Sequence, residues 1–219
     1  MEDARDRIRA MLFNANPQAF MPGHRGTDVH ELCQYMLTSE ADRVYKQLYC
    51  THCRTELENQ EVNNFTSWHC SRPVWNRKTA RLGSVNDQPT SKWLKVNTQT
   101  KSGRFCPTCI KPLEKRHVFD IPPLFIPLIV DEGISVKLEH SAILNDSEYH
   151  LIGIVYFGSF HFTCRVIDAH GEIWYNDGLA TGRKCEYEGN IKDIYLQSLL
   201  QARQGRKCSM ALYMLNSQE

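Results

Sequence analysis

The sequence predicts an α+β fold, with helices near the N-terminus followed by a sheet of antiparallel strands. Apolar residues recur at helical spacing in residues 3–13 and again from Val29 onward. Residues 149–178, YHLIGIVYFGSFHFTCRVIDAHGEIWYNDG, instead alternate β-branched and aromatic residues between glycine-bearing turns, which is typical of an antiparallel meander. Two CxxC pairs stand between these regions, so we expect a metal-binding segment there.

The composition is that of an ordinary globular protein. Of the 219 residues, 42% are hydrophobic and 23% charged, which suffices for a domain with a sizeable core. The N-terminal stretch MEDARDRIRAML lacks the apolar core of a signal peptide, and no apolar run approaches the ~20 residues that span a bilayer. We therefore expect an intracellular protein, cytoplasmic or nuclear, with no membrane partner and with reduced cysteines.

The N-terminal elements follow from spacing and caps. One helix is predicted over residues 3–13 and a proline- and glycine-bearing loop over 14–26. A second helix is predicted over 29–48, capped by Thr27 or Asp28.

Two carboxylates stand at the start of this second helix. Asp28 and Glu31 are three residues apart, so they point to one side, where the helix dipole stabilises negative charge. On the residues alone, Asp28 can simply be the N-cap and Glu31 its companion.

The next segment begins and ends with a metal-type pair. Cys50-Thr-His-Cys53 and Cys106-Pro-Thr-Cys109 are two knuckles, and four thiolates can hold Zn²⁺ tetrahedrally at ~2.3 Å each. Such a site is closed and structural, with no open position for catalysis. The alternatives are four free thiols, a single redox CxxC, or replacement ligands from His69-Cys70.

The span between the knuckles is basic and polar. Residues 70–117 hold eleven Lys or Arg against two acids, and such a span could contact phosphate. The whole chain has a net charge of only +1, so a solvated basic loop is favoured over a nucleic-acid partner. A mobile loop is predicted near Gly83–Ser91.

After the knuckles the sequence becomes strand-forming. The apolar run Val118–Val130 contains three prolines, which predicts a short edge strand or a strand entered through a polyproline turn. The remaining expectations are a strand at 134–138, a turn at Asn145-Asp146, strands at 151–157, 161–167 and 172–175, a loop at 178–189, a short helix near 191–200 and a last strand at 210–215.

Candidate chemistry lies at two strand ends of the meander. His161 opens one strand, and Asn176 and Asp177 close the next. A histidine that faces an Asn or Asp across neighbouring strands is held in the tautomer that a general base needs. The alternative is that His161 is a surface histidine on an edge strand with no catalytic role.

Taken in order, these features resemble the ubiquitin-specific proteases, a family of papain-like cysteine proteases. The resemblance runs from just after the family's nucleophile motif to the end of its domain. Five pieces carry it: residues 26–32 echo QQDAHEFL, the paired knuckles match the fingers region, 121–126 echo LPPVLxIxLxRF, 149–177 echo YxLxGVxxHxG…GHYxA…W…FDD, and 211–215 match the final strand.

The resemblance implies a papain-like fold in a single domain, 1–219. Its parts would be a helical thumb remnant (1–48), zinc-binding fingers (49–117) and a β-sheet palm with the histidine box (118–219). It makes His161 the general base and points to Asn176 as the residue that orients the imidazole, with Asp177 able to take that role. It also implies that Asp28 and Glu31 meet the basic tail of ubiquitin, where carboxylates can accept bidentate arginine bonds.

The sequence departs from the family at the nucleophile. The Gly-Asn-Thr-Cys-like motif is absent, and Phe160 replaces the glycine before the base. None of the remaining cysteines stands at a helix N-terminus, where the pKa of its thiol would fall; they are Cys33, Cys70, Cys164, Cys185 and Cys208.

Three hypotheses follow from this departure. The chain is most of a protease domain whose nucleophile comes from an upstream segment or a partner chain, or a pseudoenzyme that binds ubiquitin or a related modifier, or a zinc-stabilised nucleic-acid or scaffold protein. With the nucleophile helix missing, part of the apolar face of helix 29–48 would be uncovered, so we expect a partner segment or a rearranged packing there.

Overall fold

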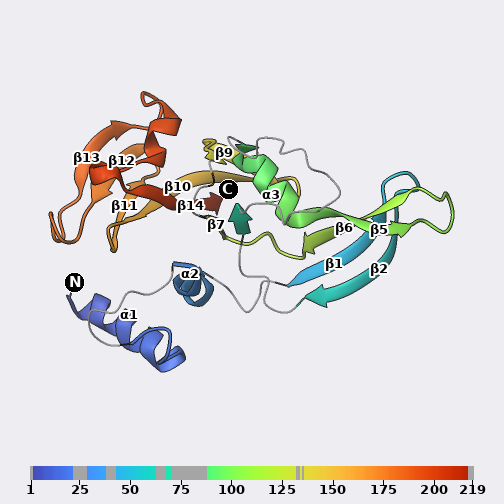
Figure 1. The fold of residues 1–219 in the computed structure, drawn as a ribbon, viewed down its shortest axis with the longest axis horizontal. Coiled ribbons are helices and arrows are strands. Elements are labelled where there is room, and N and C mark those ends of the chain that lie inside the picture. The colour runs from blue at the N-terminus through green and yellow to red at the C-terminus, as the bar shows by residue number, and fades with distance from the viewer. Residues whose placement is uncertain are drawn as a thin grey trace.

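The computed structural model describes residues 2–21, 29–37, 43–62, 68–70, 88–131, 134 and 136–216. Two sheets dominate it, with helices at the N-terminus and at the junction of the sheets (Figure 1). The helices are α1 (Glu2–Ala15), α2 (Val29–Leu37) and α3 (Thr90–Thr98), with 3₁₀ turns η1 (Leu196–Leu200) and η2 (Arg203–Gly205). The strands are β1 (Val44–Cys50), β2 (Thr55–Val62), β3 (Trp68–Cys70), β4 (Gln88–Pro89), β5 (Gln99–Phe105), β6 (Pro112–Phe119), β7 (Phe125–Val130), β8 (Val136–Lys137), β9 (Ser141–Leu144), β10 (Ser147–Gly158), β11 (His161–Ile167), β12 (Glu172–Asn176), β13 (Glu186–Asn190) and β14 (Lys207–Leu215).

The larger sheet has eight strands and holds the main core. Its order is β13-β12-β11-β10-β14-β7-β3, with β9 paired to β10. All its pairs are antiparallel except β3 with β7. The last strand of the chain, β14, lies between β10 and β7 at the centre, where Ala211 and Tyr213 are fully buried.

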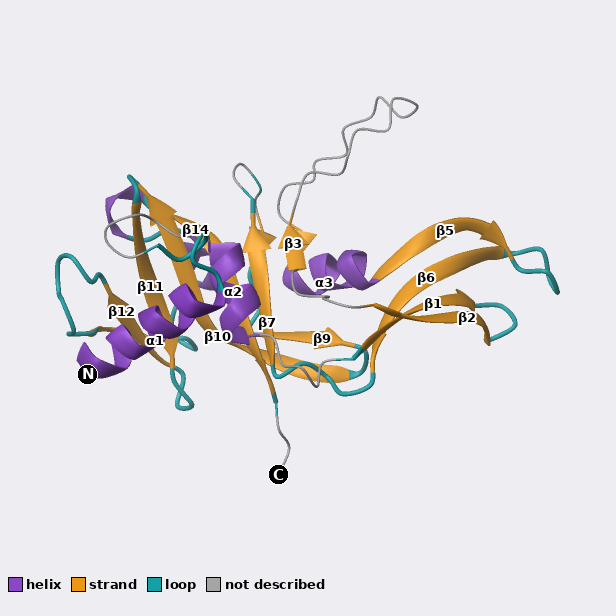
Figure 2. Ribbon diagram, turned by 90° about the horizontal axis from the view of Figure 1, so that it is seen from below, coloured by secondary structure: helices purple, strands orange, loops and turns teal. Residues whose placement is uncertain are grey.

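The smaller sheet projects away from the larger one. Its order is β2-β1-β6-β5 (Figure 2), and its strands come from residues 44–62 and 99–119. The side chains of β2 and β5 are mostly exposed, and Cys50, Cys106 and Leu113 form a small buried cluster of their own. The fold is thus mixed α and β, with few helices and mainly antiparallel sheets. The division into thumb, fingers and palm stays a prediction.

Two helices cover opposite faces of the larger sheet. In α2, the Cys33 thiol lies 3.1 Å from the sulfur of Met210. In α3, Trp93 and Leu94 join the core cluster that contains Ala211. Because Met210 and Ala211 are neighbours in one strand, their side chains point to opposite faces, so the sheet lies between α2 and α3.

The predicted meander is confirmed, and its hairpins use the expected tight turns. Asn145 and Asp146 join β9 to β10 with φ of 46° and 66°. Ser159 and Phe160 join β10 to β11 with φ of 53° and 57°. Two consecutive residues with positive φ are the mark of a type I′ turn, whose twist matches that of the flanking strands.

The helix predicted over 29–48 is wrong in its second half. It ends at Leu37, and Val44–Cys50 is strand β1. Within β1, Val44, Leu48 and Cys50 share one face and are buried, while Tyr45, Gln47 and Tyr49 on the other face are half-buried; this is the period of two of a strand, broken only at the exposed Lys46. The partners of this strand are β2 and β6, so long-range pairing outweighs the local helical pattern.

The proline-containing strand is not at an edge. β7 lies between β14 and β3, and the described part of β3 pairs with Leu128, Ile129 and Val130. Pro127 pairs with Leu212 of β14 and lies just before the described β3 ladder.

Three further differences concern short elements. The predicted loop at 178–189 contains the start of β13, and the predicted helix near 191–200 is the 3₁₀ turn η1. Of the predicted mobile loop 83–91, residues 83–87 lie outside the described part, and the rest forms β4 and the start of α3. Among the described residues, no helix is long and apolar enough to cross a membrane.

Candidate functional site

The first member of the candidate site is His161, at the start of β11. It pairs with Gly158 at the end of β10, directly after the Ser159-Phe160 turn. Its side chain is 18% exposed. The tight turn therefore fixes the backbone of the histidine at the rim of the sheet while its ring stays partly open to solvent.

The second member is Asp177, the residue after β12. Its Oδ1 atom accepts the backbone N–H groups of Leu179 and Ala180 at 3.1 and 3.3 Å. The Thr181 hydroxyl donates to its carbonyl oxygen at 3.0 Å. This Asx-type turn holds a carboxylate that is only 4% exposed.

The two side chains meet. Nε2 of His161 lies 2.7 Å from Oδ1 of Asp177. The hydrogen bond from His161, followed by those from Ala180 and Leu179, lowers the pKa of Asp177 despite its desolvation. An ionised carboxylate can only accept hydrogen bonds, so a neutral His161 carries its proton on Nε2 and presents Nδ1 as the acceptor. This is the arrangement that a general base requires.

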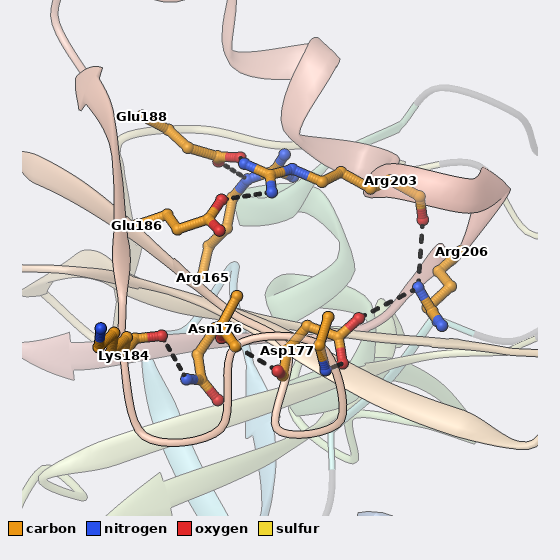
Figure 3. Close-up of polar contacts among 10 residues, drawn as sticks. Arg165, Asn176, Asp177, Lys184, Glu186, Glu188, Arg203 and Arg206 are labelled. Carbon is orange, nitrogen blue, oxygen red and sulfur yellow. Dashed lines mark hydrogen bonds and ion pairs between the residues drawn. The ribbon is translucent and has the colours of Figure 1, made fainter.

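Asn176 does not take part in this contact. Its side-chain amide donates to the carbonyl oxygen of Gly182 at 3.3 Å and to that of Lys184 at 3.1 Å (Figure 3). Successive strand residues point to opposite sides, so only one of Asn176 and Asp177 can face His161. The geometry favours Asp177, which the family resemblance gave as the alternative to Asn176.

Behind Asp177 lies a group of charged residues that the sequence did not reveal. Arg206 Nη1 is 3.6 Å from Asp177 Oδ2. Farther away, Arg165 Nε donates to Glu188 at 2.5 Å, and Arg203 pairs with both Glu188 and Glu186 (Figure 3). In the sequence, Arg165 could have indicated this group, because it is a charged residue at an inward-facing position of a predicted strand.

None of the nine cysteines, all within the described residues, is hydrogen-bonded to His161. Cys33 is buried against Met210, and Cys164 faces away from His161 on β11. Burial raises the pKa of Cys164, of Cys70 and, to about 12, of Cys208. Cys185 is exposed and follows the loop that binds Asn176. The His161–Asp177 pair therefore has no cysteine of this chain within hydrogen-bonding distance of the imidazole.

The four knuckle cysteines do come together. The sulfur atoms of Cys50, Cys53, Cys106 and Cys109 all lie within 4.8 Å of one another. The Cys50–Cys109 and Cys53–Cys106 separations are 3.5 and 4.0 Å, on either side of the ~3.8 Å expected for a tetrahedral Zn–S length of ~2.3 Å. The donor set and its spacing fit a closed metal site.

The crowding of these four thiols also separates their pKa values. Backbone N–H groups of Cys109 and Thr108 lower the pKa of Cys106 to about 6. The hydrogen bond with Cys109 and burial raise the pKa of Cys53 to about 12. The pKa values of four crowded thiols diverge in this way because the first thiol to ionise leaves a negative charge, which raises the pKa of its neighbours.

The alternative ligands from His69-Cys70 are not supported. Cys70 belongs to β3 of the larger sheet, is fully buried there, and does not belong to the four-cysteine group. The side chain of His69 lies outside the described residues.

Of the two residues expected to contact ubiquitin, the structure describes one. Asp28 lies outside the described residues. Glu31 stands in the first turn of α2 and is half-buried.

The fold can be compared with known proteins. The sequence matches no family model and no curated protein. Among solved structures, the chain is similar to the SAGA DUB module Ubp8/Sgf11/Sus1/Sgf73 bound to monoubiquitin, with a TM-score of 0.58 and 11% identity over 95% of this chain. It is also similar to this module bound to ubiquitin aldehyde, with a TM-score of 0.52 and 9% identity over 96% of this chain. The chain has the fold of a ubiquitin-specific protease domain.

At this level of identity the likeness concerns the fold alone. The chain covers 52% and 48% of those two matched chains, so it spans about half of their length. The activity, substrate and partners of this ubiquitin-specific protease-like chain are therefore matters for proposal.

Proposed function

We propose that this chain is a ubiquitin-specific protease-like domain that recognises the C-terminal tail of ubiquitin and supplies the base half of a thiol-dependent isopeptidase site. The observation that carries the proposal is the 2.7 Å contact between His161 Nε2 and Asp177 Oδ1 at the rim of the sheet. Two of the similar structures hold monoubiquitin and ubiquitin aldehyde, which supports ubiquitin as the substrate class.

In this proposal the nucleophilic cysteine comes from an upstream segment or a partner chain. Nδ1 of His161 takes the proton of that thiol, and the thiolate attacks the isopeptide carbonyl carbon. The imidazolium then returns its proton to the leaving amine, while Asp177 stabilises its charge and keeps the ring in place. Asp28 and Glu31 would attract the basic tail.

The metal has a structural part in this proposal. Cys50, Cys53, Cys106 and Cys109 would hold Zn²⁺ with all four positions filled by protein, so the ion would stabilise the projecting sheet and take no part in hydrolysis. None of the nine cysteines forms a disulfide, which supports an intracellular location, cytoplasmic or nuclear.

The alternative is a pseudoenzyme that binds ubiquitin without cleaving it. The observation in its favour is that no cysteine of the chain is hydrogen-bonded to His161. A ubiquitin probe with an electrophilic C-terminus tests the premise that both possibilities share, namely that no cysteine of this chain is the nucleophile. We expect it to leave the isolated chain unlabelled, and labelling of any of the nine cysteines would contradict a nucleophile from outside.

Ubiquitin binding itself is tested by titration. We expect the chain to bind ubiquitin, and Glu31→Lys to weaken binding at least tenfold because it places a cation against a basic tail. Asp193→Lys reverses an exposed charge beside β13 and is the matched control. Absence of binding, together with steeply salt-dependent binding to DNA, would instead favour a nucleic-acid role for the basic span.

A further inference from the structure

The carboxylate of Asp177 has two oxygens with different partners. Oδ1 faces His161 and the N–H groups of Leu179 and Ala180. Oδ2 faces Nη1 of Arg206 at 3.6 Å. This separation is too long for a direct hydrogen bond, but it is a close charge contact between side chains that are only 7% and 6% exposed. Low exposure makes such a contact count for more than a surface ion pair.

Arg206 also packs against Gly158, at the end of β10. A Cβ atom on Gly158 would stand 3.1 Å from Cγ and 3.3 Å from Cα of Arg206, so a side chain there would push Arg206 aside by a few tenths of an ångström. Gly158 is the backbone partner of His161. Arg206 therefore lies against the backbone partner of His161 and close to the carboxylate of Asp177.

The turn before β14 sets the position of this arginine. Gln204 and Gly205 have φ of 59° and 75°, and the carbonyl of Arg206 accepts the N–H of Ala202 at 2.8 Å. Nη1 of Arg206 lies 3.5 Å from the Arg203 carbonyl (Figure 3). The side chain of Arg203 turns instead to Glu186 and Glu188 of β13, so it is the backbone carbonyl of Arg203 that faces Arg206.

We infer that Arg206 is a positioning residue for the His161–Asp177 pair, because its guanidinium holds Oδ2 of Asp177 so that Oδ1 stays directed at Nε2 of His161. The inference rests on the proposed function, in which His161 is the base. Without this cation, Oδ2 would be a nearly buried carboxylate oxygen lacking a positive partner, and the group would turn towards solvent. His161 would then lose the contact that fixes its tautomer.

The tautomer of His161 is the direct readout. Long-range ¹H–¹⁵N correlation spectra of the imidazole rings distinguish a proton on Nε2 from one on Nδ1. They are recorded on the whole chain at about pH 8.5, above the ordinary histidine pKa of ~6.5. The signals of His161 are assigned by their loss in His161→Gln. We expect the Nε2–H form in the parent chain.

Arg206→Gln is expected to convert this single form into a mixture of both tautomers. Arg206→Lys keeps a cation and is expected to restore the Nε2–H form. Arg203→Gln is the matched control, because it removes a neighbouring arginine that does not contact Asp177, and it should leave the tautomer unchanged. If Arg206→Gln and Arg203→Gln have equal effects, or if Arg206→Gln folds and has none, the inference is wrong.

A reciprocal measurement covers the case in which Arg206→Gln does not fold. In Asp177→Asn the guanidinium signals of Arg206 should shift and show faster bond rotation, while those of Arg203, held by Glu186 and Glu188, should not. Unchanged Arg206 signals in Asp177→Asn would overturn the inference. None of these measurements uses ubiquitin, so failure of ubiquitin binding tests the proposed function separately.

Discussion

At the scale of single residues, the pH response of the fold should reveal the state of Asp177. Its pKa is lowered from the ordinary value of 3.8, chiefly by the hydrogen bond from His161. A carboxyl with a depressed folded-state pKa stabilises the fold above its ordinary pKa, and this contribution disappears as the pH falls towards the lowered value.

We therefore expect Asp177→Asn to lower the free energy of unfolding at neutral pH, and the difference from the parent chain to shrink below about pH 4. Urea unfolding measured in steps from neutral to acidic pH gives both quantities. Asp193→Asn, an exposed aspartate, is the control and should show no such pH-dependent difference. A constant difference across the range would mean that Asp177 is not ionised in the fold.

Two glutamates on β13 offer a second residue-scale prediction. Glu188 pairs with Arg165, whose side chain is 10% exposed, and Glu186 pairs with Arg203, whose side chain is 49% exposed. Removing one partner of a buried pair leaves an uncompensated charge and costs about 3–5 kcal/mol, whereas an exposed pair contributes ~0–1 kcal/mol. Denaturant unfolding should find Glu188→Gln at least ~2 kcal/mol less stable than Glu186→Gln. Equal costs would show that burial does not separate the two pairs.

The sequence led to His161 and Asp177 but not to the contacts between them. Their nearness to strand ends can be read from the period of two and from turn residues. The choice between Asn176 and Asp177 cannot be read from the sequence, because it depends on which of these two neighbouring side chains faces β11. Arg206 escaped notice because the turn that positions it is far along the chain from either residue.

At the scale of elements, local patterns succeeded where they matched the final partners. The hairpins around Asn145-Asp146 and Ser159-Phe160 connect strands that are adjacent in sequence, so turn chemistry and alternation suffice. The helix predicted over β1 was wrong because one of the partners of this strand, β6, lies much later in the chain. α3 was missed because its Asn- and Thr-containing sequence has weak helix propensity, and the burial of Trp93 and Leu94 outweighs it.

The projecting sheet should depend on the metal. Its buried cluster consists of Cys50, Cys106 and Leu113, separate from the main core, so it has little apolar burial to keep it folded. Chelation is therefore expected to unfold β1, β2, β5 and β6 while leaving the eight-stranded sheet intact. Amide hydrogen exchange before and after chelation measures this difference. Protection that survives in the projecting sheet would contradict a structural zinc site, and Cys53→Ser should reproduce the loss without chelator.

At the scale of the whole molecule, the order of weak motifs identified the fold better than any of them alone. The similar structures share only 11% and 9% of their residues with this chain over 95% and 96% of its length. At that identity few side chains remain in common, so the likeness lies in the arrangement of the backbone.

Both N-terminal helices carry exposed apolar side chains, although Cys33 on the apolar face of α2 is buried. Tyr35 and Met36 of α2 are 43% and 49% exposed, and Ile8 and Met11 of α1 are 42% and 70% exposed. The α1 and α2 regions lie together, because Asn16 donates to the Tyr35 hydroxyl at 3.3 Å. Clustered exposed apolar side chains of this kind mark contact surfaces, and here the proposed occupant is the segment or chain that carries the nucleophile.

The isolated chain should therefore bind a hydrophobic dye such as ANS at this surface. Changing Met11 and Met36 together to Gln is expected to remove most of the dye fluorescence without lowering the free energy of unfolding, because both side chains are exposed. Ile143→Gln, at a 65% exposed position on the strand β9, is the control and should leave the signal nearly unchanged. Dye binding that persists in the Met11/Met36 variant would show that the helices are covered by the chain itself, and the proposed site for the nucleophile segment would then have to lie elsewhere.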